Sequence, residues 1–176
     1  MTHDFTIVGA GIVGLSTAFK LSKAYHNAHI LILEKEDRVA AHQTGNNSGV
    51  IHSDIYYKPN SYRAKNCVNG RHQLVDFCQQ HNVAHEICGK VIVATEEKQL
   101  HSLDEIFKTG TINEIEGIKK IGPDELKEIE PYANGIKAIH VPCTGIVDFT
   151  GVCEKWNCNK KVDSGLSMLC GYGLLC

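Results

Sequence analysis

The chain lacks several features that would place it in a large class of proteins. Its 176 residues carry a formal net charge of −2 and its lysines are scattered, so no basic surface for nucleic acid is expected. The longest apolar stretches, such as 30–33 and 91–94, are far shorter than the roughly 18 residues of a membrane-spanning helix. The eight cysteines show neither CxxC pairs nor the His/Cys spacing of a zinc site. We therefore expect no nucleic-acid partner, no transmembrane segment and no metal.

The N-terminus also lacks the basic segment, apolar run and small-residue cleavage site of a secretory signal. It leads instead directly into an apolar strand. We therefore predict a cytoplasmic protein whose cysteines are mostly reduced. With 43% apolar and 22% charged residues, the composition is that of a globular protein with one domain or two small ones.

Three glycines near the N-terminus have the spacing GxGxxG within the segment "FTIVGAGIVGLSTAFKL". An apolar strand is predicted over 4–8, a helix over 15–24 and a second strand over 28–33, so the glycines lie between a strand and a helix. Glu34 follows the second strand, 20 residues after Gly14. This order predicts a βαβ unit that binds a dinucleotide.

Each of these positions has its own physical role in such a unit. Gly9 makes the tight turn, Gly11 lets the backbone approach a pyrophosphate, and Gly14 lets the helix pack closely on the strand. The N-terminus of the helix favours phosphate, and Glu34 accepts hydrogen bonds from ribose hydroxyls. The alternative is a structural corner with a surface glutamate. The loop that follows, "HQTGNNSGVIH" at 42–52, favours a long dinucleotide.

Beyond this unit the sequence alternates between helical and extended patterns. A polar loop with a short helix is expected over 35–61, in which "KEDR" forms a solvated turn. Helices are predicted over 62–82, over 96–110 with Gly110 closing it, and from Pro123 to Pro131. Strands are predicted over 88–95, over 118–121, and from 136 up to a turn at 144–145. No stable element is predicted from Trp156 onward.

Six segments together carry a resemblance to a family of flavoproteins. They are "TIVGAGIVGLSTA", "HQTGNNSGVIHS", "IYYKP", "CGKVIVAT", "EIEPY" and "TGIVDF". In their order and spacing, over about 4–155, the chain resembles the D-amino-acid-oxidase-like FAD-dependent oxidoreductases, and more narrowly the L-2-hydroxyglutarate oxidase or dehydrogenase family. The resemblance implies an α/β fold: the N-terminal part of a doubly wound, Rossmann-like FAD-binding domain with the beginning of an α+β substrate domain. The expected divisions are an FAD-binding part at 1–88, a partial substrate domain at 89–148, and a domain end with an aberrant tail at 149–176.

The same resemblance implies an activity. It is the oxidation of a small 2-hydroxy acid, L-2-hydroxyglutarate, to 2-oxoglutarate by FAD, with electrons passing to membrane quinone. The protein is then expected in the cytoplasm or peripherally on the inner face of the membrane. Two alternatives stay open: another flavoprotein of the superfamily, acting on an amino acid, an amine or glycerol 3-phosphate, and a non-catalytic dinucleotide-binding remnant.

Site residues follow from the resemblance position by position. Those expected to hold FAD are Gly9, Gly11, Gly14 and Glu34 at the ADP half, and Thr44, Asn47, Ser48, Gly49 and Val50 along the pyrophosphate toward the isoalloxazine. His52 is the expected catalytic residue, since a neutral imidazole can take the hydroxyl proton, or else it only packs within the loop. Tyr56, Tyr57 and Lys58 are expected to meet the substrate, or else to form the rim of a surface loop.

The chain departs from the family at two positions and at its end. Asp54 and Asn60 stand where relatives have glycine, so a positive φ at Asp54 would cost strain there. After Lys155 the family pattern is lost, as a frameshift followed by an early stop would produce. The resemblance therefore leads us to expect a truncated chain that is inactive or impaired.

Overall fold

The computed structural model describes residues 2–158 and 166–170 of the chain, and for 157–158 and 166–170 it describes the backbone only. The chain divides into two compact units. The first comprises 1–49, 81–84 and 148–176, and the second comprises 50–80 and 85–147. We describe each unit by itself. The functional divisions at 88 and 148 stay a prediction.

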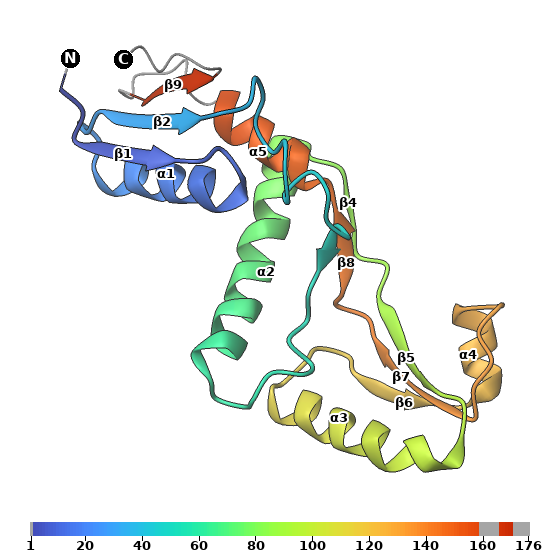
Figure 1. Ribbon diagram of the computed structural model, residues 1–176. Coiled ribbons are helices and arrows are strands. Elements are labelled where there is room, and N and C mark those ends of the chain that lie inside the picture. Colours follow the sequence, from blue (N-terminus) through green and yellow to red (C-terminus); the bar gives the residue numbers. More distant parts are fainter. Residues whose placement is uncertain (1, 159–165, 171–176) are drawn as a thin grey trace. The chain divides into compact units, whose positions relative to one another are not determined.

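The first unit begins with the predicted βαβ arrangement (Figure 1). It consists of β1 (Phe5–Val8), α1 (Ile12–Ala24) and β2 (Ile30–Glu34). The two strands pair in parallel, with Phe5 opposite Ile30 and Val8 opposite Leu33. The helix begins three residues before the predicted start, because the glycine turn is tighter than a six-residue loop. The strand-turn-helix order that the sequence predicts is confirmed.

A second helix shares the core of this unit. Helix α5 (Phe149–Cys158) packs beside α1, where the rings of Phe19 and Trp156 stack with centroids 6.0 Å apart. The buried core residues are Ala10, Leu15, Ala18, Ile30, Ile32, Val39, Ala40 and Cys153. Both helices therefore cover the same face of the parallel sheet.

The end of the chain differs from its prediction. Instead of an irregular tail from Trp156, α5 continues to Cys158 and β9 (Leu166–Cys170) pairs in parallel with β2, giving the strand order β1-β2-β9. The remaining residues of the tail, 159–165 and 171–176, lie outside the described part. Periodicity failed to predict β9 because its backbone pairs with a strand more than 130 residues away in sequence.

The second unit contains a long helix and a small sheet. Helix α2 (Tyr62–His81), almost all of which belongs to this unit, confirms the prediction over 62–82. The sheet consists of β3 (Val50–Ile51), β8 (Gly145–Val147) and β4 (His85–Glu86), in that order and antiparallel. The "TGIVDF" segment therefore supplies the middle strand of this sheet.

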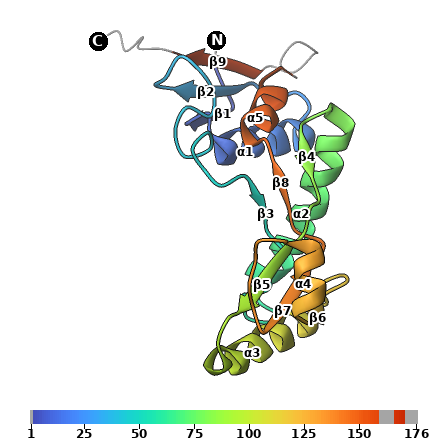
Figure 2. The ribbon, with the colours of Figure 1, turned by 90° about the vertical axis from the view of Figure 1, so that its right-hand side faces the viewer.

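The other sheet of this unit lies between two helices (Figure 2). Its strands are β5 (Lys90–Ala94), β7 (Lys137–Val141) and β6 (Lys119–Ile121), antiparallel and in that order. Helix α3 (Leu100–Ile112), preceded by the 3-10 helix η1 (Glu97–Gln99), covers the face of Ile92 and Ile139. Helix α4 (Pro123–Ile129) packs on the opposite face, against Val91 and Val93.

Two local predictions were wrong. Gly110 does not close its helix: it is buried within α3, which continues to Ile112. The loop over 35–61 contains bends, turns and β3 but no helix, and Ala40 within it adopts a left-handed φ of 57°. The strand expected from 136 up to a turn at 144–145 is observed as β7, and the turn that separates it from β8 lies at 142–144.

The fold class is otherwise confirmed. The first unit is a parallel sheet with helices on it, and the second is an α+β unit whose sheets are antiparallel. In a parallel sheet of this kind, ligands bind beyond the carboxyl ends of the strands.

Candidate functional site

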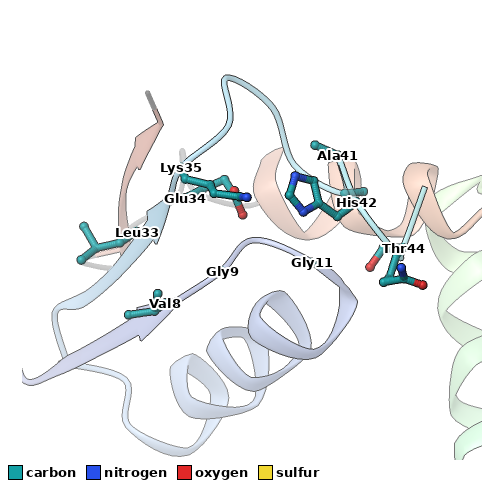
Figure 3. A pocket seen from close by; sticks show the side chains of 11 residues that line it. Val8, Gly9, Gly11, Leu33, Glu34, Lys35, Ala41, His42 and Thr44 are labelled. Carbon is teal, nitrogen blue, oxygen red and sulfur yellow. The ribbon is translucent and has the colours of Figure 1, made fainter. Parts of the chain in front are cut away.

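A cavity of about 400 Å³ lies at the carboxyl ends of β1 and β2 and the start of α1 (Figure 3). All its lining residues belong to the first unit. They are Val8, Gly9, Gly11, Leu33, Glu34, Lys35, Ala40, Ala41, His42, Gln43 and Thr44. Val8 is 83% exposed, so an apolar side chain stands open to solvent inside this site.

The glycine turn is built so that side chains would block it. Gly9 has a φ of 100°, in the region that favours glycine. A Cβ on Gly14 would lie 2.0 Å from the Gly9 carbonyl oxygen, so α1 packs directly on the turn. At Gly11 a Cβ would lie 3.1 Å from Thr44 Oγ1, on the cavity side. The turn therefore leaves its backbone uncovered by side chains on the cavity side, and its predicted role toward a pyrophosphate stays a prediction.

The loop after β2 returns across the start of α1. Thr44 Oγ1 accepts a hydrogen bond of 3.0 Å from the Ile12 N–H, in the first turn of the helix. The Ala40 N–H donates to the Ala10 carbonyl at 3.1 Å. That first turn contains no acidic residue, so the positive end of the helix dipole is not neutralised by its own side chains. The arrangement therefore favours an anion at this point.

Glu34 lies on the opposite wall of the cavity and is ordered by backbone donors. Its Oε2 accepts a hydrogen bond of 2.6 Å from the Ala10 N–H, and its Oε1 accepts one of 3.0 Å from the Glu36 N–H. Burial raises the pKa of Glu34, but these N–H groups, that of Lys35 and the nearby His42 outweigh burial and lower it below 4.5. The carboxylate is therefore ionised near neutral pH and keeps lone pairs that can accept ribose hydroxyls.

Besides apolar residues and Gln43, the predicted site residues leave out two titratable side chains of this cavity, Lys35 and His42. His42 Nε2 lies 2.8 Å from Glu36 Oε1 and Lys35 Nζ lies 3.6 Å from the same oxygen, which joins the loop to the end of β2. The "KEDR" segment is thus part of the cavity wall as well as a turn. Lys35 could have been assigned to the cavity from its position in the sequence, because it directly follows Glu34, the glutamate that ends β2.

Asn47 holds the next part of the loop in shape. Its amide Nδ2 donates to the carbonyl oxygens of Thr44 and Gln43, and its Oδ1 accepts a hydrogen bond of 2.6 Å from the Gly49 N–H. Ser48 is exposed, and Gly49 has a φ of 67°. Val50 already belongs to β3 in the second unit. The predicted roles of these residues toward FAD stay predictions.

The predicted catalytic and substrate residues all lie in the second unit. The His52 side chain is exposed, and its carbonyl accepts a hydrogen bond of 3.6 Å from Cys67 Sγ. Tyr56 is exposed. The guanidinium carbon of Arg63 lies 5.6 Å from the ring centroid of Tyr57. Lys58 is exposed. Their functions stay predictions.

Asp54 has the strained geometry that its sequence position suggests. Its φ is 59°, and Asn60, the other departure expected from the resemblance, has a φ of 63°. Asp54 is only 4% exposed, and neither of its carboxylate oxygens has a hydrogen-bond partner among the described residues. Burial raises its pKa above 3.8, although the positive charge of Arg71 partly opposes the effect. Asp54 therefore costs the fold both strain and desolvation.

Metal sites and membrane-spanning helices are both absent from the described residues. Within residues 2–158 and 166–170, no three His, Cys, Asp or Glu side chains are grouped so that they could hold a metal. In the same residues, no helix has the length and apolar character needed to cross a membrane.

Comparison with known proteins defines the family. The family model described as FAD dependent oxidoreductase matches residues 4–156, and the chain therefore belongs to this family. Its cofactor is FAD, as the glycine turn and the following loop predict. Among relatives, the chain is 51% identical over 156 residues to L-2-hydroxyglutarate dehydrogenase of Indibacter alkaliphilus. It is 47% identical over 171 residues to mitochondrial L-2-hydroxyglutarate dehydrogenase of Pongo abelii.

These matches cover most of this chain and a smaller part of each relative. They span 89% and 97% of this chain, but 39% and 41% of the length of the two relatives. In fold, the chain is similar to the L-alpha-glycerophosphate oxidase of Mycoplasma pneumoniae, with a TM-score of 0.86 and 24% identity, over 97% of this chain and 45% of that one. The likeness shows that the fold is shared.

Gly14→Ala is expected to damage the site, because the added Cβ would meet the Gly9 carbonyl. We expect the free energy of unfolding to fall by at least about 1–3 kcal/mol, with a loss of FAD binding. The control is Gly70→Ala in α2, where nothing lies within 4 Å of the added Cβ and a gain of ~0.5–1 kcal/mol is expected. Chemical denaturation checks both variants, and equal stability of the two would contradict the close packing.

Asp54→Gly is expected to stabilise the protein at pH 7 by about 1–3 kcal/mol, because it removes a buried carboxylate without partners. The raised pKa sets the pH dependence. Below about 3.8 the carboxyl is protonated in the folded and the unfolded chain, so the gain is smallest there. It grows as the pH rises from that value through the folded-state pKa. Thermal melts across this range check the trend, with exposed Asp37→Gly as the control, and a gain that shrank with rising pH would refute it.

Proposed function

We propose that this chain binds the ADP half of FAD in the cavity of its first unit. The observation that carries the proposal is the cavity that Gly9 and Gly11 line together with an ionised Glu34, while Gly14 lets α1 pack closely on the turn. The residues present fit the group, because Gly11 and Thr44 line the cavity and a Cβ at Gly11 would narrow the space that the backbone leaves open beside Thr44 Oγ1. In this proposal Glu34 accepts hydrogen bonds from the ribose hydroxyls, and the start of α1 faces the pyrophosphate.

We further propose that the protein oxidises L-2-hydroxyglutarate to 2-oxoglutarate. Support comes from the names of the two relatives reported above, which are 51% and 47% identical to this chain. FAD, when bound, accepts the hydride from the substrate. Thr44, Asn47, Ser48, Gly49 and Val50 would extend the FAD contacts toward the isoalloxazine.

The remaining residue roles belong to the same proposal. His52 takes the proton of the substrate hydroxyl, and Tyr56, Tyr57 and Lys58 meet the carboxylates by hydroxyl donation and by charge. Quinone as the electron acceptor, and a cytoplasmic location at the inner face of the membrane, are parts of the proposal that rest on the resemblance alone.

The test of cofactor binding compares two glutamates under the same substitution. Glu34→Gln removes the charge and one acceptor oxygen at the cavity, so FAD affinity should fall about 10- to 100-fold. The matched control is Glu128→Gln, at an exposed position on α4, which should leave the affinity unchanged. Quenching of flavin fluorescence on titration measures both, and equal affinities would contradict the proposed role of Glu34.

Anaerobic flavin reduction then tests the substrate. The FAD-loaded chain is mixed in turn with L-2-hydroxyglutarate, D-2-hydroxyglutarate, glycine and glycerol 3-phosphate. Bleaching by L-2-hydroxyglutarate in preference to the others supports the proposed reaction, whereas preference for glycine or glycerol 3-phosphate reassigns the substrate. Absence of bleaching with FAD bound would refute oxidation by this chain and would support the sequence-based expectation of an inactive or impaired chain.

A further inference from the structure

Lys90, at the start of β5, carries a charge that no acidic side chain balances among the described residues. It is half-buried, and burial lowers the pKa of its ammonium group, although the nearby thiols of Cys143 and Cys67 partly oppose this effect. By contrast, Lys119 pairs with Glu125 and Lys120 Nζ lies 2.6 Å from Asp104 Oδ1 in the same unit. A desolvated ammonium without a counter-charge is unfavourable, and such groups are typically paired.

The position of Lys90 joins an apolar cluster to an exposed aromatic ring. Its register partner on β7 is Val141, which is fully buried in a cluster with Ile55 and Cys143. Its Nζ lies 5.2 Å from the ring centroid of Tyr56, which is 62% exposed. The ammonium therefore lies at a boundary between buried apolar residues and a ring open to solvent.

The other buried cation of this region already has partners. Arg71 is 9% exposed at its side chain, donates to the Cys143 carbonyl at 3.2 Å and lies 3.4 Å from Glu116 Oε2. Its charge also faces Asp54, the one buried carboxylate beside it. Lys90 is thus the cation of this region whose counter-charge is missing, and its cation–π contact with Tyr56 supplies only part of the compensation.

We propose that Lys90 binds one carboxylate of a dicarboxylate ligand, with Tyr56 beside the ammonium. The inference rests on the proposed function, because a C5 dicarboxylate is the substrate considered there. It adds a residue that the resemblance did not assign, and it gives the Tyr56 segment a cationic partner within the same unit. A desolvated lysine gains more from an anion than an exposed lysine does, since the competing water is reduced. With one carboxylate on Lys90 and the other on Tyr57 or Lys58, this site favours dicarboxylates over monocarboxylates.

The experiment measures binding of two unreactive probes to the FAD-loaded chain by calorimetry. Glutarate has two carboxylates and butyrate has one. Lys90→Met keeps the length and the apolar stem but removes the charge, and Lys90→Arg keeps the charge. The matched control is Lys108→Met, at an exposed position on α3.

In Lys90→Met, glutarate affinity should fall about 10- to 100-fold and the preference for glutarate over butyrate should largely disappear. Lys90→Arg should restore part of that preference, and Lys108→Met should match the parent chain. If Lys90 has a purely structural role, Lys90→Met weakens the binding of both probes equally and leaves the ratio of the glutarate and butyrate affinities unchanged. That result would overturn the inference. Unaltered glutarate binding in Lys90→Met would overturn it as well while sparing the proposed function. No glutarate binding by the parent chain, with FAD bound, would refute both.

Discussion

The close packing of α1 on the glycine turn is the constraint on which the cofactor site depends. Because the Gly14 position lies directly against the Gly9 carbonyl, α1 begins four residues after the end of β1, and the turn between them, with Gly9 and Gly11, lines the cavity. The same geometry brings the Ala10 N–H within 2.6 Å of Glu34. A longer turn would separate the helix terminus from the glutamate, and a single ligand could not contact both.

The parts of this site that sequence could predict are those set by local chemistry. Gly9 needs a positive φ, Gly14 has no room for a side chain, and Glu34 ends a short apolar strand. All three requirements are visible as a residue pattern within about 30 residues of sequence. Helix α2 could also be predicted from the sequence, because its apolar positions recur with helical spacing. Asp54 and Asn60 were also informative, because the resemblance led us to expect glycine at both positions and both have a left-handed backbone here.

The parts that could not be predicted depend on contacts between distant segments. Strand β9 exists through its pairing with β2, and its own sequence holds no clear period. Gly110 resembled a helix end, yet it is buried beside Ile118 and the helix continues. The burial of Lys90 beside Tyr56 likewise joins residues from two separate segments. In each case tertiary packing outweighs the local signal, which is typical of nonlocal β pairing and of buried charges.

The most direct test of the central claim is the amide NMR spectrum of the chain during titration with ADP, the half of FAD that the cavity is proposed to hold. The account predicts shifts concentrated at the glycine turn, 9–13, with further shifts at 34–36 and at Thr44. Shifts confined to the second unit, or an unchanged spectrum at millimolar ADP, would contradict it.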